Sequence, residues 1–293
     1  GVLHEIAPEE ALSDTATQPL MEVHFINVGQ GDCTLIVCPN GQRILIDAGS
    51  STGNFDASDV RSYLLSKLDH DSPRVDALVI THADSDHYDL LPTVLVGVSV
   101  GHIFTSADVS EHTEAGVDTW LEAFDADDRT RLAGTDFNVA PAKPLADCGD
   151  AQVLVLASNV TDTTVDSAKN THSVVLKVTY GTVDFILTGD ATRDTENSIM
   201  QRFDPAFLNV EVLKLGHHGS NATSTSAEWA AAVRPKIAVA SAGKNNNYGH
   251  PHRDVVGRIE PYTAVAEPHA FRWSWRVGSV AKFADFADYR EAV

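Results

Sequence analysis

Short apolar runs separated by polar turn residues set the pattern of the early part of the chain. Residues 22–27, 33–38 and 43–47 are rich in branched and aromatic side chains. Gly-Gln-Gly-Asp at 29–32 and Pro-Asn-Gly at 39–41 stand between them, and both are typical turn sequences. The pattern predicts three consecutive β-strands.

The spacing then changes from that of strands to that of helices. Residues 56–68 carry apolar side chains at helical intervals, which predicts an amphipathic helix. A continuous apolar run at 75–81 predicts a buried strand, and residues 88–95 predict the start of a helix that Pro92 interrupts. The order is strand, polar loop, helix.

A further strand is predicted at 101–105 and a helix at 117–124. The second half repeats this style, with strands predicted at 152–157, 173–178, 183–187, 211–215 and 236–240, and helices at 194–203, 227–233 and 255–259. Two β-rich halves with helices favour the α/β (α+β) class, with two sheets packed face to face and helices outside, a four-layer αββα sandwich.

The domain organisation follows from length and periodicity. Residues 1–20 lack clear periodicity and are interpreted as a loosely ordered lead-in, and 278–293 as a C-terminal tail. Residues 21–277 contain no Pro/Gly/Ser-rich linker, so we expect a single domain. The longest apolar runs, such as 94–100, fall well short of the ~18–20 residues that cross a bilayer. We therefore expect a soluble chain, either cytoplasmic or secreted. Because the sequence begins at Gly1, it leaves open whether a signal segment was removed.

The charge balance limits the partners. With 41 acidic and 21 basic residues the formal net charge is −20, which repels a polyanion over most of the surface. This disfavours extended nucleic-acid binding. A small or locally bound anionic substrate, including a nucleic-acid end, stays compatible because bound metal ions reverse the local field. Cys33, Cys38 and Cys148 lack the spacing of a zinc knuckle, and we expect buried small hydrophobic residues there, with the redox compartment left open.

The strongest chemical signal is Thr-His-Ala-Asp-Ser-Asp-His at 81–87, directly after an apolar strand. His82, Asp84, Asp86 and His87 offer four potential ligands in one strand-to-helix loop. Imidazole and carboxylate ligands suit zinc, manganese or iron, whereas a structural zinc site more often uses thiolates. The competing interpretation is a solvated acidic turn with two surface histidines.

With this loop the sequence resembles the metallo-β-lactamase superfamily, whose signature has the form His-x-His-x-Asp-His. Asp84 stands where the second His usually stands, and His-x-Asp-x-Asp-His is similar to the ComEC-type hydrolase domain. Further matches follow in the family order, at 25–32, 44–49, 170–173, 187–190, 214–220 and 248–252. Two departures are Tyr88-Asp89 after the signature His, and His172 where ComEC-like chains often carry Asn.

The resemblance implies a ligand set for two divalent ions, zinc first and manganese as the alternative. It assigns His82, Asp84 and His172 to one ion, Asp86, His87 and His218 to the other, and Asp190 between them. A bridging carboxylate offsets the repulsion of two cations, which neutral imidazole does not. For His172, a hydrogen-bonded histidine at a strand start is the other interpretation.

The candidate catalytic residues are Asp86, His217 and His250. Neighbours at a strand end usually point to opposite sides, so His218 is favoured as the ligand and His217 as an acid or phosphate contact, with the exchanged roles left open. His250 is a second candidate acid, or a plain turn histidine before Pro251.

Several neighbours have supporting roles in this interpretation. Asp47 is expected to accept a hydrogen bond from a ligand histidine and so orient the signature loop. Gln30 and Asp32 either face the pocket or form a polar turn, and residues 241–247 either donate to an anionic substrate or form an Asn-rich turn.

These residues imply a dinuclear metal-dependent hydrolase. The expected reaction is cleavage of a phosphodiester by a metal-bound hydroxide, with His217 or His250 protonating the leaving oxygen. The alternatives are a lactam, ester or thioester hydrolase of the same fold, and a non-catalytic binding module that metal ions only stabilise.

Overall fold

The computed structural model describes residues 19–161, 168–244, 246–263, 265–267 and 273–277. The expected lead-in at 1–20 lies almost wholly outside these ranges, and the expected tail at 278–293 lies wholly outside them. The division into lead-in, single domain and tail therefore stays a prediction.

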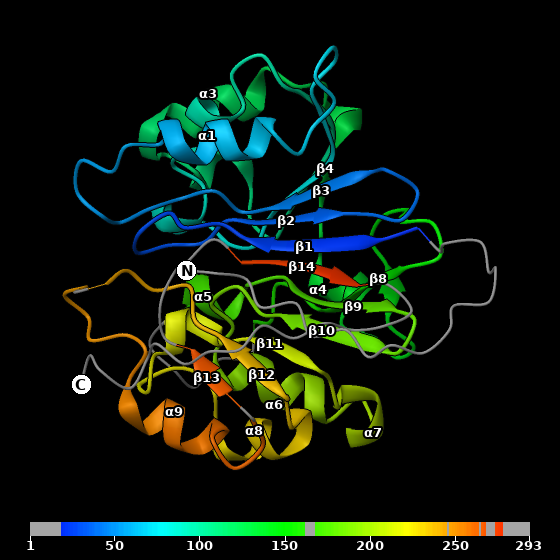
Figure 1. Cartoon of the computed structure of the whole chain (residues 1–293), viewed down its shortest axis with the longest axis vertical. Helices are drawn as coiled ribbons and strands as arrows, with labels where there is room; N and C mark the ends of the chain where they lie inside the picture. The colour runs from blue at the N-terminus through cyan, green and yellow to red at the C-terminus, as the bar shows by residue number, and fades with distance from the viewer. Residues whose placement is uncertain (1–18, 162–167, 245, 264, 268–272, 278–293) are drawn as a thin grey trace, which may run out of the picture.

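Within the described ranges the strands form two seven-stranded sheets that face each other (Figure 1). The first sheet has the order β14 (Trp273–Val277), β1 (Met21–Phe25), β2 (Thr34–Val37), β3 (Arg43–Ile46), β4 (Arg74–Ile80), β5 (Ser99–Thr105) and β6 (Arg129–Arg131). The second has the order β13 (Val265–Glu267), β12 (Ile237–Val239), β11 (Val212–Lys214), β10 (Val183–Leu187), β9 (Val175–Tyr180), β8 (Gln152–Ala157) and β7 (Lys143–Pro144).

Helices cover the outer face of each sheet, so the molecule has four layers (Figure 1). α1 (Ser58–Leu65), α2 (Leu91–Val94) and α3 (Val117–Glu122) pack on the first sheet, and α6 (Arg193–Met200), α8 (Ala227–Val233) and α9 (Arg253–Ile259) on the second. The other α-helices of the described ranges are α4 (Gly134–Phe137), α5 (Ala168–Thr171) and α7 (Pro205–Leu208). The expected αββα sandwich is confirmed.

The period of two along each strand explains why one strand serves two cores. In β3, Ile44 and Ile46 enter the core between the sheets, while Leu45 faces the helices outside. In β10, Phe185 enters the core between the sheets and Ile186 the outer core under α6 and α8. Apolar side chains on both faces make such strands read as continuous hydrophobic runs.

Strand direction determines where the loops gather. β3, β4 and β5 run parallel to one another, and so do β10, β11 and β12. Parallel strands bring their carboxyl ends to the same edge of a sheet, so the loops after β3 and β4 are neighbours, as are those after β10 and β11. Figure 1 shows the strand pairs that carry these loops in the two facing layers.

The long elements match the predicted positions within a few residues, and the differences have local reasons. The helix predicted at 88–95 is limited to α2, where Pro92 lies in the first turn and its missing N–H is not needed. The short strands β6 and β7 were not predicted, because runs of two or three residues carry no periodicity. β14 pairs with β1 from the far end of the chain.

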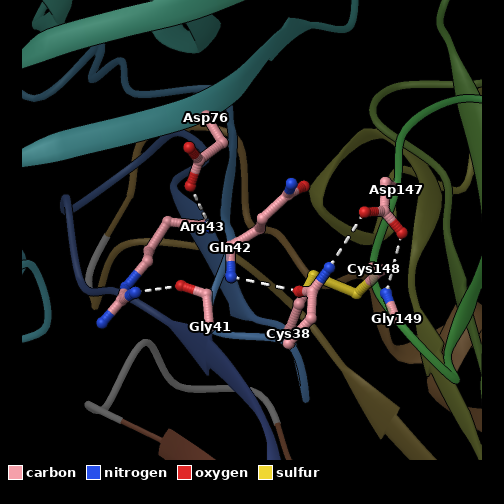
Figure 2. The surroundings of a disulfide bond; sticks show 9 residues. Cys38, Gly41, Gln42, Arg43, Asp76, Asp147, Cys148 and Gly149 are labelled. Carbon is pink, nitrogen blue, oxygen red and sulfur yellow. Dashed lines mark hydrogen bonds between the residues drawn. A yellow bond between two sulfur atoms is a disulfide. The ribbon is translucent and has the colours of Figure 1, made fainter.

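The expectation for the cysteines was wrong for two of the three. Cys38 and Cys148 form a disulfide across a sequence separation of 110 residues, and Cys33 is a buried free thiol. Figure 2 shows that the disulfide joins the turn after β2 to the turn before β8, where Asn40 also donates to Asp147. Spacing along the chain carries no sign of this pair, because the two sheets bring the cysteines together.

The disulfide lies at the end of the sandwich opposite to the carboxyl ends of β3 and β10. Cys38 follows β2, which is antiparallel to β3, and Cys148 precedes β8, which runs in the direction of β10 because both are antiparallel to β9. In the described part of the chain no helix has the length and apolar character of a membrane span.

Candidate metal centre

The residues singled out by the sequence meet at the carboxyl ends of the strands. His82 follows β4, Asp190 follows β10 and His218 follows β11. The side chains of all three are buried, with 0 to 2% of each residue exposed. The loop after β4 in the first sheet and the loops after β10 and β11 in the second therefore close around one volume.

The signature loop turns sharply after β4. A 3₁₀ turn at Ser85–His87 is closed by a hydrogen bond from His87 N to Asp84 O of 3.0 Å. This turn brings the imidazole rings of His82 and His87 to a centroid separation of 4.2 Å. Both rings are fully buried, while Asp84 and Asp86 keep side-chain exposures of 36% and 20%, so the loop has a dry side and a side open to solvent.

Asp47 holds this loop, as the sequence predicts. It sits directly after β3 with a positive φ of 58°, and its carboxylate accepts from Thr81 N and Thr81 Oγ1, each at 2.7 Å. His87 Nδ1 lies 2.7 Å from Asp47 Oδ2 and donates to it. The tautomer that this bond selects leaves a lone pair on His87 Nε2, the atom that faces the centre.

Asp190 enters the centre from the second sheet. Its backbone N–H donates to Ser173 Oγ at 3.1 Å. Gly189 before it has a φ of +52°, and a Cβ there would meet the Thr81 side chain at 2.9 Å. Glycine is therefore required for the close approach that brings Asp190 against the signature loop. Asp190 Oδ1 lies 3.1 Å from His87 Nε2.

His217 and His218 both approach Asp190, which differs from the expected alternation. They follow β11 in a turn with φ values of 47° and 54°, so the strand rule of opposite sides does not apply. Their Nε2 atoms lie 3.6 Å and 3.4 Å from Asp190 Oδ2. Their Nδ1 atoms differ: that of His218 donates to Ser241 O at 2.7 Å, and that of His217 lies 2.6 Å from Thr223 Oγ1.

Four residues form a cluster whose ligand atoms lie within 4.8 Å of one another: Asp32, His87, Asp190 and His218. The Nε2 atoms of His82, His87 and His218 are buried and have no hydrogen-bond partner. Such orphaned atoms are costly unless another group satisfies them. His218 Nε2 is also 3.2 Å from Asp86 Oδ2.

These separations fit ligands of a shared cation. Two donors at the usual 2.0–2.2 Å from a tetrahedral zinc are about 3.3–3.6 Å apart. The nitrogen-to-oxygen distances of 3.1, 3.2 and 3.4 Å at His87 and His218 are close to that range. A buried set of imidazole and carboxylate donors, without thiolates, suits a divalent metal ion.

The electrostatics show a site built for positive charge. Burial lowers the pKa of His87, but the carboxylates of Asp190 and Asp47 outweigh it and raise that pKa well above its usual value. Burial raises the pKa of Asp86, yet the neighbouring imidazoles of His218 and His87 bring it down to about 2. The same carboxylates attract cations, whether protons or metal ions.

Two predicted site residues, His172 and His250, are not members of the cluster. His172 lies outside the cluster of four, and burial together with the charges of Arg131 and His82 lowers its pKa. The His250 ring lies 6.1 Å from that of His218 and 5.7 Å from that of His217. Burial and these two neighbours lower the pKa of His250 to about 4.

Other side chains near the centre were left open or missed by the sequence interpretation. Asp32 belongs to the cluster, and Gln30 accepts from Gly243 N at 3.0 Å, which ties the first turn to the 241–247 loop. Lys214 was not singled out. It is the last residue of β11, and its ammonium contacts the carboxylate of Asp32. A lysine in a buried strand is the one signal that could have revealed it.

Comparison with known proteins agrees with this geometry. Residues 26–244 match the family model of the metallo-beta-lactamase superfamily. The chain is 31% identical over 258 residues to ComE operon protein 3 of Bacillus subtilis (strain 168), covering 83% of this chain and 31% of that protein. It is 30% identical to Recombination protein 2 of Haemophilus influenzae, covering 89% of this chain and 29% of that protein. The chain thus spans about a third of the length of these relatives.

Solved structures share the fold at low identity. The metallo-beta-lactamase fold protein YhfI from Bacillus subtilis superposes with a TM-score of 0.53 and 13% identity, covering 88% of this chain and all of that one. CmlA, a diiron beta-hydroxylase from Streptomyces venezuelae, gives a TM-score of 0.53 at 15% identity, covering 90% of this chain and 55% of that one. The matches confirm the expected resemblance to the superfamily and to ComEC-type competence proteins. The chain belongs to the metallo-beta-lactamase superfamily.

Proposed function

We propose that this chain is a metal-dependent hydrolase that cleaves a phosphodiester at a dinuclear centre. The observation that carries the proposal is the convergence of three buried, unpartnered imidazole nitrogens with the carboxylate of Asp190. The nitrogens belong to His82, His87 and His218. A merely structural cluster would satisfy them with internal hydrogen bonds.

The ligands divide into two groups in this proposal. His82 and Asp84, whose Nε2 and Oδ2 atoms are 3.5 Å apart, hold one ion together with His172. A second set, made of Asp86, His87 and His218, holds the other. We assign Asp190 to both ions; its Oδ1 contacts the imidazole of His87 and its Oδ2 that of His218, both in the second set. Zinc is the first candidate and manganese the second.

Divalent cations bound there supply an activated water and neutralise the negative charge that develops on the phosphoryl oxygens. The protein supplies the proton transfer. Burial lowers the pKa of both His217 and His250, so a proton that either ring picks up is readily passed to a departing alkoxide. His250 Nδ1 is buried without a hydrogen-bond partner, which leaves it free for this role.

An anionic substrate is favoured by a lysine at the mouth of the site. Lys169 Nζ lies 3.4 Å from Asp84 Oδ1 and donates to Ala83 O at 3.0 Å, and 56% of its side chain is exposed. This cation stands beside the partly exposed ligand in a chain of net charge −20. One relative is named for recombination, which adds nucleic-acid ends to the candidate phosphodiesters.

The test combines metal content with turnover. We expect the purified chain to bind two equivalents of zinc or manganese and to hydrolyse bis(4-nitrophenyl) phosphate but not a β-lactam. His82→Ala and Asp190→Ala should each reduce turnover more than about 100-fold, beyond the effect of losing an outer hydrogen-bond partner. His102→Ala is the matched control, because His102 is a half-buried histidine on β5 that contacts Thr130. Unchanged turnover in Asp190→Ala would refute the proposal.

A further inference from the structure

We infer that Asp32 is an additional oxygen ligand at the His87/His218 side of the centre, and that Lys214 locks it in position. The inference rests on the proposed metal centre and adds to it a residue outside the signature motif. Asp32 lies in the turn between β1 and β2, far in sequence from every other ligand. It is nevertheless the fourth member of the buried cluster.

The backbone fixes Asp32 against the signature loop. Asp32 N donates to Asp86 O at 3.1 Å, and Gly49 N donates to Asp32 O at 3.1 Å. At Gly31 a Cβ would meet Asp86 O at 2.6 Å and would collide with Gly49 O, so only glycine allows this approach. The turn is therefore built to bring a carboxylate next to Asp86 and the turn that follows β3.

Lys214 accounts for one oxygen of that carboxylate. Its Nζ contacts Asp32 Oδ2, donates to Gly189 O at 2.8 Å and lies 3.9 Å from Asp190 Oδ1. The side chain is 3% exposed, so its charge must be paired within the protein. The lysine thus holds both Asp32 and the backbone that carries Asp190.

The other oxygen of Asp32 is what points to a ligand. Asp32 Oδ1 is buried and has no hydrogen-bond partner, in a side chain that is 4% exposed. An uncompensated buried carboxylate oxygen is costly. Asp32 also offers one carboxylate oxygen within 4.8 Å of ligand atoms of His87, Asp190 and His218, so a cation bound among them would pair with this carboxylate.

The second sheet contains a similar pair, a buried lysine with an aspartate, away from the centre. This pair allows the role of a metal ligand to be separated from that of a counter-ion to lysine. Lys177 Nζ donates to Asp184 Oδ2 at 2.8 Å and to Phe207 O at 2.6 Å, and its side chain is 5% exposed. The Asp184 side chain is 24% exposed, so water hydrates its carboxylate and no bound cation is needed there. Asp184→Asn is therefore the matched control for Asp32→Asn.

The experiment measures metal binding rather than activity. Zinc is titrated into chelator-treated protein in competition with a coloured chelator, for the wild type, Asp32→Asn and Asp184→Asn. The asparagine keeps one oxygen for Lys214 and turns an amide N–H₂ toward the cluster, so a ligand role predicts at least 10-fold weaker binding of one ion. Asp184→Asn should change neither affinity by more than about twofold.

Equal zinc affinities in Asp32→Asn and the wild type would overturn the inference and reduce Asp32 to a counter-ion of the lysine. If Asp32→Asn does not fold, the charge-free pairs Asp32→Asn/Lys214→Met and Asp184→Asn/Lys177→Met give the same comparison, because neither leaves an unpaired buried charge. A wild type that binds two ions tightly but does not cleave phosphodiesters would refute the proposed function alone. A wild type that binds no zinc would overturn both.

Discussion

Removal of the disulfide should destabilise the protein strongly without affecting the metal centre. The change is Cys38→Ala/Cys148→Ala, which opens a covalent loop of 110 residues between the two sheets (Figure 2). In the chain-entropy description a closed loop of this length restricts the unfolded state by about 4.8 kcal/mol, and measured effects are usually about 2–4 kcal/mol. We expect a loss of about 3–5 kcal/mol in the free energy of unfolding.

The magnitude is large because the loop contains 110 of the 293 residues of the chain. It includes β3 to β6 of the first sheet and β7 of the second, so the reduced unfolded chain gains freedom over both layers. Both cysteines are at most 2% exposed and belong to the core between the sheets, so alanine adds a small cavity cost. The metal centre lies at the other end of the strands and should be unaffected.

Urea unfolding and thiol counting test this together. The wild type should show no reactive thiol when native, one when unfolded without reductant, and three when unfolded and reduced. The single thiol is Cys33, where burial raises the pKa of the thiol and keeps it unreactive. Cys33→Ala is the matched control and should lack the loop-entropy loss. Equal unfolding free energies for the oxidised wild type and the double variant, or lost zinc binding in the folded double variant, would refute the reasoning.

Three further predictions concern single residues. Asp47→Asn should weaken zinc binding about 10- to 100-fold in chelator competition, because it removes the acceptor of the His87 Nδ1–H; wild-type affinity would contradict this role. Lys169→Met should raise KM for an anionic diester severalfold with kcat little changed, Lys169→Arg should restore it, and a fall confined to kcat would contradict a binding role. Glu196 is buried, and its pKa is raised, chiefly by burial. Its ionisation therefore lowers the free energy of unfolding. This loss is absent below the unfolded pKa of about 4.5 and grows as pH rises through the folded pKa. The stability of the wild type relative to Glu196→Gln should therefore fall with rising pH in urea unfolding, and a rise would contradict the sign.

The local pattern of the sequence was enough for the framework and for much of the site. Apolar runs at the strands and helical spacing at 56–68 depend on neighbours a few residues apart, so they are readable from the chain alone. The signature loop is equally local, because His82 and His87 follow the same strand within one short turn. Asp47 could be predicted because a ligand imidazole needs a partner for its second nitrogen.

Only the tertiary structure decided the distant contacts that neither the local pattern nor the family resemblance implied. The disulfide, the pairing of β14 with β1 and the Lys214–Asp32 contact join segments that no periodicity relates. The turn that directs both His217 and His218 to Asp190 depends on left-handed backbone conformations that the strand pattern does not encode. The physical reason is range: side-chain alternation is fixed by the local backbone, whereas contacts between the two sheets are fixed by the packing of their shared core.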